Sequence, residues 1–277
     1  MRINTNVSAM TTLRYLNQAT DAKSASLTKL SSGSRINSAS DDAAGLTVSE
    51  GMKAQIGGTE QAENNAEDAT SLVQTAEGSM SETQTILDRM RTLAVESANG
   101  TLTTDDRNSI GDEFSQLTDE INRLANSTIF NGQNLLTGGT KGTTFSFQIG
   151  AYTSTDNNIS VNIKGMSSGS LGVASLSITS AAAAEKAIGA IDKALTNVSG
   201  ARATLGAVEN RLSYATSNLE TTDENTSEAN SRIRDVDMAQ EMTEYTKENI
   251  LSQAATTMLS QANSMPNSAL TLLQSLS

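Results

Sequence analysis

The feature that most constrains the fold of this chain is an apolar repeat of about 3.5 residues between positions 69 and 94. Apolar or small side chains recur there at alternating steps of four and three, the spacing at which α-helices pack as a coiled coil. A second run keeps this alternation from Ile188 to Val236, although several of its positions are polar. At 1.5 Å per residue that helix would be roughly 70 Å long, so the repeat predicts an elongated rod. The first run is Ala69, Val73, Ala76, Met80, Thr83, Leu87, Met90 and Ala94.

Short breaks separate the helices of this rod. Asn99-Gly100 is a typical stop at a helix C-terminus. Thr103 and Asp106 have the spacing of a capping box for the next helix, and the short connection predicts that the two helices run antiparallel. Further breaks are expected at Gly57-Gly58 and near Asp223-Glu224-Asn225. The apolar positions of the second helix are Ile110, Phe114, Leu117, Ile121 and Leu124.

The character of the sequence changes between residues 138 and 178, where glycines cluster. Two short runs in this segment alternate between apolar and polar side chains, which is the period of a half-buried β-strand. They predict a small β-hairpin region packed against the rod. The apolar positions of the runs are Phe145, Phe147, Ile149, Ile159, Val161 and Ile163.

The two ends of the chain carry matching apolar stripes at helical spacing. In the last 29 residues, Asn249 to Ser277, no side chain is charged, yet the stripe persists. Each stripe needs a partner, and the other end of the chain offers one. The sequence therefore predicts terminal helices that pair. The stripes are Ile3, Val7, Met10, Leu13 and Leu16 at one end, and Ile250, Leu251, Ala254, Ala255, Met258, Leu259 and Ala262 at the other.

Together these patterns predict a mainly α fold. It consists of an elongated coiled-coil-like helical bundle rod, a small β-hairpin region and terminal helices that pair. We expect residues 1–44 and 236–277 to form the two halves of a terminal helical domain. Residues 45–235 form the rod, with the β region at 138–178.

Composition argues against chemistry on a small molecule. The chain has no His and no Cys, which removes imidazole acid–base catalysis, thiol nucleophiles and the usual zinc sites. No phosphate-binding glycine loop is present. The net charge of −12 leaves −16 in residues 41–248, because residues 1–40 sum to +4 and 249–277 to zero. We therefore expect no enzyme, no cofactor or metal, no nucleic-acid partner and, without a run of 18 apolar residues, no membrane insertion.

Several ordered motifs at both ends of the sequence closely resemble those of bacterial flagellin. The resemblance covers about residues 1–137 and 181–274. The longest motifs run from Leu30 to Ala39 and from Asp41 to Leu46, and shorter ones lie at Ile3–Val7, Phe130–Gly132 and Ile250–Ala254.

The resemblance implies a structural subunit that polymerises into the flagellar filament. This chain would be a short form of that subunit, without a large outer domain. It also implies export through a type III apparatus and an extracellular location. Because this route reads no cleaved signal, none is expected. Implied partners are other subunits, an export chaperone, and the cap and hook-junction proteins. The paired termini would form the filament core. The side chains expected at this interface are Ile3, Val7, Met10, Leu13, Leu16, Leu27, Leu30, Ile250, Leu251, Ala254, Met258, Leu259, Leu270, Leu272 and Leu273.

Two further sites are expected. In flagellins recognised by Toll-like receptor 5, the contact surface matches Arg89, Leu93 and Glu113 here. The uncharged C-terminal segment is expected to line the central channel, because charged walls would retain passing unfolded subunits. The channel-lining candidates are Ser252, Gln253, Thr256, Ser260, Gln261 and Asn263.

The main alternative function is that of a hook–filament junction protein, which shares the apolar termini. Such proteins do not usually carry the run from Arg35 to Leu46 that is present here. Electron microscopy separates the two functions, because a junction protein should not form long filaments alone.

Overall fold

The computed structural model describes residues 5–275, without the side chains of residues 266, 267 and 269–275. The contacts divide the chain into two units. We call residues 5–54 and 225–275 the terminal unit, and residues 55–224 the rod unit. Two long helices, α2 (Ala43–Ala98) and α5 (Ala181–Arg234), contribute to both units. The domain boundaries expected from the sequence, at 44/45 and 235/236, lie about three helical turns from this division.

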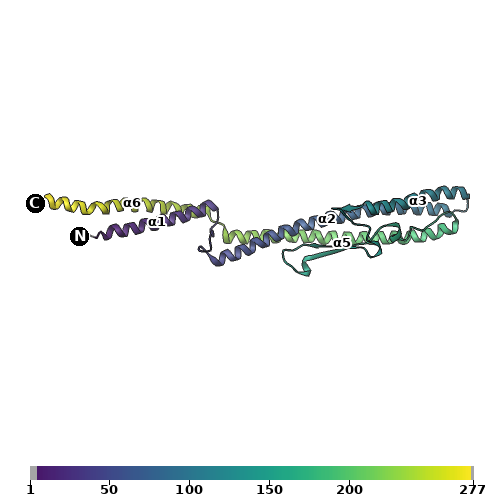
Figure 1. Ribbon diagram of the computed structural model, residues 1–277, viewed down its shortest axis with the longest axis horizontal. Coiled ribbons are helices and arrows are strands. Elements are labelled where there is room, and N and C mark those ends of the chain that lie inside the picture. Colours follow the sequence, from purple (N-terminus) through teal and green to yellow (C-terminus); the bar gives the residue numbers. More distant parts are fainter. Residues whose placement is uncertain (1–4, 276–277) are drawn as a thin grey trace. The chain divides into compact units, whose positions relative to one another are not determined.

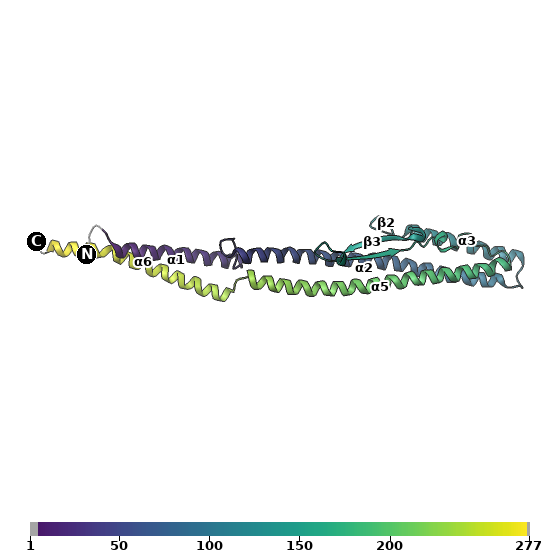
Figure 2. The same cartoon turned by 90° about the horizontal axis from the view of Figure 1, so that it is seen from below.

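In the rod unit, α2 and α5 lie side by side and run antiparallel, as both cartoon views show (Figures 1 and 2). Gln74 of α2 donates to Glu209 of α5 at 2.7 Å, whereas Arg91, further along α2, meets Asp192, earlier in α5. All eight positions of the predicted repeat from Ala69 to Ala94 are at most 1% exposed. The period of the apolar pattern therefore identified the face of α2 that forms the core.

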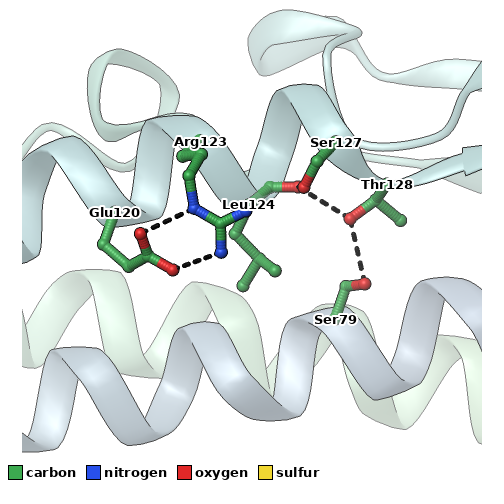
Figure 3. A network of polar contacts seen from close by, with 6 residues as sticks. All are labelled: Ser79, Glu120, Arg123, Leu124, Ser127 and Thr128. Atoms are coloured by element: carbon green, nitrogen blue, oxygen red, sulfur yellow. Dashed lines mark hydrogen bonds and ion pairs between the residues drawn. The ribbon is translucent and has the colours of Figure 1, made fainter.

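The third rod helix, α3 (Thr104–Ser127), folds back along α2 after the turn at Asn99-Gly100. Its predicted capping box is confirmed. Asp106 N–H donates to the Thr103 hydroxyl oxygen, and Thr103 N–H donates to the Asp106 carboxylate at 3.0 Å. At the other end, the Thr128 hydroxyl lies 2.7 Å from the Leu124 carbonyl oxygen and 2.9 Å from the Ser79 hydroxyl on α2 (Figure 3). Both ends of α3 are thus fixed by polar contacts.

This capping box predicts a local dependence on pH. The Thr103 hydroxyl and then the Thr103 N–H stabilise the Asp106 carboxylate, so the pKa of Asp106 lies below its ordinary value. A lowered pKa in the folded state stabilises the fold above the unfolded value of about 3.9 and is lost as pH falls through the folded value. We expect Asp106→Asn to be less stable than wild type at neutral pH, and this difference to shrink in acid well below the unfolded value of about 3.9. Thermal unfolding followed by circular dichroism measures it, and a difference that is the same at both pH values would contradict the assignment.

The predicted β region is a hairpin of β3 (Thr143–Gln148) and β4 (Asn158–Ile163). The strands are antiparallel, with Phe145 opposite Val161 and Phe147 opposite Ile159. These side chains and Ile163 belong to the rod core or pack against it, as the alternation predicted. Short helical turns η1 (Gly139–Lys141), η2 (Thr155–Asn157) and α4 (Ser168–Leu171) surround the hairpin. A second hairpin, β1 (Ile129–Phe130) with β2 (Gln133–Asn134), was not predicted, although its Asn131-Gly132 turn is a strong hairpin signal.

Both of the additional helix breaks expected from the sequence are wrong. Helix α2 continues through Gly57-Gly58, and a Cβ at Gly58 would lie 2.7 Å from the Ala151 side chain. This glycine therefore allows the β region to approach the helix closely. Helix α5 continues through residues 223–225 because Asp, Glu and Asn cost a helix only a few tenths of a kcal/mol each, about 0.7 at most, which packing overrides.

In the terminal unit, α1 (Val7–Ser32) pairs with α6 (Met238–Ser275) in antiparallel orientation (Figures 1 and 2). Asn6 Nδ2 donates to the Ala262 carbonyl at 2.8 Å, and Lys23 Nζ donates to Asn249 Oδ1 at 2.8 Å. The prediction that the terminal helices pair is thus confirmed. Gly33, with φ of 71°, ends α1 in the left-handed conformation that favours glycine.

Candidate assembly surface

The most buried positions of the seam between α1 and α6 carry small or polar side chains. The most buried residues on it are Ala19, Ser26, Glu248 and Ala262, each at most 9% exposed. Small residues let two helix backbones approach closely, but they remove little apolar area from water. Nearby, Glu244 at 2.8 Å raises the pKa of Lys247, with a smaller contribution from Glu248. The α1–α6 contact therefore leaves most of the larger apolar side chains of both helices uncovered.

These larger side chains stay on the surface, and we call them the apolar stripes. Each is between 46% and 67% exposed, so the expectation that the two stripes cover each other is wrong for them. The physical reason is that the two helices meet along one line of each apolar face, closest at the small residues Ala19 and Ala262, so the side chains that flank this line stay exposed. Contiguous exposed apolar side chains of this kind mark interaction surfaces. The apolar stripes comprise Val7, Met10, Leu13, Leu27, Ile250, Leu251 and Met258.

The other expected interface residues are placed differently. Leu16 and Leu30 on α1 and Leu259 on α6 are half-buried and fall at helical spacing from the buried seam residues, so they belong to the seam, whereas Ala254 is exposed. Ile3 lies outside the described residues, as do the side chains of three leucines in the last turns of α6. These are Leu270, Leu272 and Leu273.

A groove runs along one side of this helix pair. It has a volume of about 530 Å³ and is lined on α1 by Tyr15 and Ala22, and on α6 by Leu251, Ala255 and Met258. Tyr15 itself is 57% exposed and was not among the predicted stripe residues, none of which is aromatic. Met238, Met242 and Met265 on α6 are also about half exposed and were missed, although their helical spacing continues the stripe.

The channel-lining candidates on α6 do not share one environment. Ser252 is half-buried and falls at helical spacing from Glu248, Ala255 and Ala262, so it belongs to the seam with α1. The other five candidates are exposed, which leaves them available to line a wet surface. They are Gln253, Thr256, Ser260, Gln261 and Asn263.

The receptor-contact candidates lie where α2 and α3 meet. The Arg89 guanidinium pairs with the Glu113 carboxylate at 2.7 Å, and both side chains are about half exposed. Leu93 is 2% exposed, so its side chain lies in the rod core and presents almost no surface in the monomer. Because α3 and α5 both cover this part of α2, the buried face is broader than one seam and includes Leu93.

Within residues 5–275, no helix is both long enough and apolar enough to cross a membrane.

Comparison with known proteins connects this geometry to a family. Residues 3–141 match the family model for the bacterial flagellin N-terminal helical region, and residues 188–273 match that for the bacterial flagellin C-terminal helical region. The chain is 46% identical to flagellin of Bacillus subtilis (strain 168), over 99% of this chain and all of the relative. It is 44% identical, at the same coverage, to the flagellar filament 30.7 kDa core protein of Treponema maltophilum.

Among solved structures, similarity extends to a flagellar hook-associated protein from Vibrio parahaemolyticus. The TM-score is 0.58 at 18% identity, over 70% of this chain and all of that one. At that identity the likeness concerns the helical fold alone.

Proposed function

Because this chain belongs to the bacterial flagellin family, we propose that it is a structural subunit that assembles into the flagellar filament. The observation that carries the proposal is the pair of exposed apolar stripes on the terminal helices. A soluble monomer gains nothing from these side chains, whereas each Leu, Ile or Met contributes about 1.5–3 kcal/mol when a neighbouring subunit buries it.

Electron microscopy of the purified full-length chain after salt-induced assembly tests this proposal. We expect long filaments formed by this protein alone. Short oligomers without filaments would instead favour the hook–filament junction alternative, for which no present observation argues.

The same family membership supports an extracellular location, because the filament lies outside the cell. We propose that the chain is secreted through the type III route and meets an export chaperone, the cap and the hook-junction proteins on the way. Since its relatives are named as structural filament proteins, we propose no enzymatic role. Recovery of the protein with filaments sheared from cells tests the location, and its absence from that fraction would contradict it.

We also propose that the exposed uncharged residues of α6 line the filament channel. Serine and asparagine offer hydrogen bonds that water already satisfies, whereas a charged wall attracts passing segments of opposite sign. Lys at both Ser260 and Asn263 is therefore expected to shorten filaments and slow subunit export, and Thr at Ser260 with Gln at Asn263 is the matched neutral control. Normal growth with the lysines, in filaments that assemble soundly, would contradict the proposal.

The exposed pair of Arg89 and Glu113 supports a proposed contact with Toll-like receptor 5. Arg89→Ala removes the guanidinium at a site where the ion pair itself contributes less than about 1 kcal/mol to stability. We expect the variant monomer to stay folded and to give a weaker signal in a receptor reporter assay. Arg123→Ala, which removes another exposed arginine from the rod unit, is the control. Equal signals from wild type and Arg89→Ala would remove the proposal.

A further inference from the structure

The chain contains two Asn-Gly sequences in exposed turns, at Asn99-Gly100 and at Asn131-Gly132. An asparagine side chain followed by glycine is open to attack by the next backbone nitrogen, because glycine has no side chain to obstruct the approach. The two turns have the same covalent chemistry, so any difference in their reactivity must come from the folded structure.

The structure places three favourable features around Asn99. Its Oδ1 accepts a hydrogen bond from Thr101 N–H at 3.3 Å, which folds the side chain back beside the Gly100 peptide. Its carbonyl oxygen accepts a hydrogen bond from Arg107 Nη2 at 2.8 Å. Arg107 is held in this position because its Nε donates to the Ser97 carbonyl at 3.0 Å. Within residues 5–275, the Gly100 N–H meets no hydrogen-bond acceptor, and a Cβ at Gly100 would meet no atom within 4 Å.

Each of these contacts assists one part of a cyclisation. When the Gly100 nitrogen loses its proton, the negative charge spreads onto the Asn99 carbonyl oxygen, where the Arg107 guanidinium stabilises it. When that nitrogen attacks Cγ, charge develops on Oδ1, which the Thr101 N–H faces. The open space around Gly100 leaves room for the ring that forms.

We propose that Asn99 is a site of self-catalysed deamidation promoted by Arg107. A solvent base takes the proton of the Gly100 nitrogen, a bond forms between this nitrogen and Asn99 Cγ, and the Cγ–Nδ2 bond breaks. Nδ2 gains a proton and leaves as ammonia, which gives a succinimide. Water then opens the ring at either carbonyl carbon, so the product is aspartate or isoaspartate.

Asn131 serves as the internal comparison. It sits in a tight hairpin turn with φ of 46°, followed by Gly132 with φ of 78°, and the flanking Phe130 and Gln133 are paired across β1 and β2. Among the described residues, no arginine or lysine donates to its carbonyl oxygen. Cyclisation there would have to open the turn without electrostatic assistance, so we expect it to be slower.

Deamidation of Asn99 would change the α2–α3 turn. It adds a carboxylate close to Arg107, and the isoaspartate product inserts one more atom into the backbone where Asn99 N–H donates to the Glu96 carbonyl. This turn would then lose the geometry that lets α3 return along α2.

The experiment incubates the folded full-length chain at mildly alkaline pH and follows each asparagine by peptide mass spectrometry and isoaspartyl methyltransferase labelling. We expect residue 99 to react about tenfold faster than residue 131 in the folded protein, the effect of one charge-assisted hydrogen bond. The two rates should become equal in denaturant, where only the shared Asn-Gly chemistry remains.

Two variants separate the role of Arg107 from exposure alone. Arg107→Gln should slow residue 99 about tenfold and leave residue 131 unchanged, whereas Arg107→Lys should retain part of the acceleration. Circular dichroism confirms that each variant is folded, and the wild-type comparison in denaturant needs no variant. Equal rates at residues 99 and 131 in the folded wild type would overturn the proposal, as would a rate at residue 99 that does not respond to Arg107→Gln in a folded chain.

Discussion

The Met258→Glu protein is expected to fold normally and to form no filaments. Met258 is 62% exposed in the single chain, so the substitution should change the free energy of unfolding by no more than about 0.5 kcal/mol. In a filament, the same position would place a carboxylate in an apolar contact, at a cost of several kcal/mol, on the order of 3–5 for an unpaired buried charge. Because every subunit repeats the contact, assembly should be lost rather than weakened.

Sedimentation and electron microscopy of salt-treated protein measure this outcome, with circular dichroism as the check on folding. Met258→Leu is the matched control, since it keeps the apolar contact with a volume-conserving change and should still form filaments. Long filaments of the Glu variant would show that this stripe of α6 is not an assembly contact.

Leu87→Ala is expected to destabilise the rod unit by about 2–5 kcal/mol. Leu87 is 0% exposed in the middle of the α2 repeat, and its removal leaves a cavity that the surrounding long helices cannot easily close. Urea unfolding of the monomer, followed by helicity, should show a lower midpoint for this variant.

Leu13→Ala is the control for this substitution, because Leu13 is 47% exposed on α1 in the monomer. We expect it to change the free energy of unfolding by less than about 1 kcal/mol. If both substitutions shift the urea midpoint equally, the α2 repeat does not form a packed core.

The rod could be predicted because its buried residues recur at a regular spacing in the sequence. A repeat of 4-3 steps predicts a helix face packed against other helices, and each of the eight repeat positions from Ala69 to Ala94 is buried. The hairpin of β3 and β4 was predictable for the same reason, since alternation assigns Phe145 and Val161 to one face.

The period of an apolar pattern does not show which face of a helix packs against which neighbour. The terminal stripes were correctly recognised as apolar, but their period does not show that the helices meet most closely at Ala19 and Ala262 while a larger stripe residue such as Met258 stays exposed. Leu93 lies off the α2 seam and becomes buried only because a third helix covers it. Gly58 was read as a break because its role depends on Ala151, which is remote in the sequence.

The hairpin of β3 and β4 also indicates where additional residues could be inserted into this chain. Gln148 and Asn158 are directly paired, so the loop between them starts and ends at neighbouring backbone positions. Each doubling of such a loop costs only about 0.6 kcal/mol in closure entropy, provided that the strands keep their register. The tip of the loop carries Tyr152, which is 62% exposed. Ala151 and Tyr152 contact α2 at Gly58 and Gln55, whereas residues 153–156 are exposed. Sequence inserted at 153–156 could therefore extend from the loop without displacing these contacts, which makes this segment a natural position for displaying a foreign peptide.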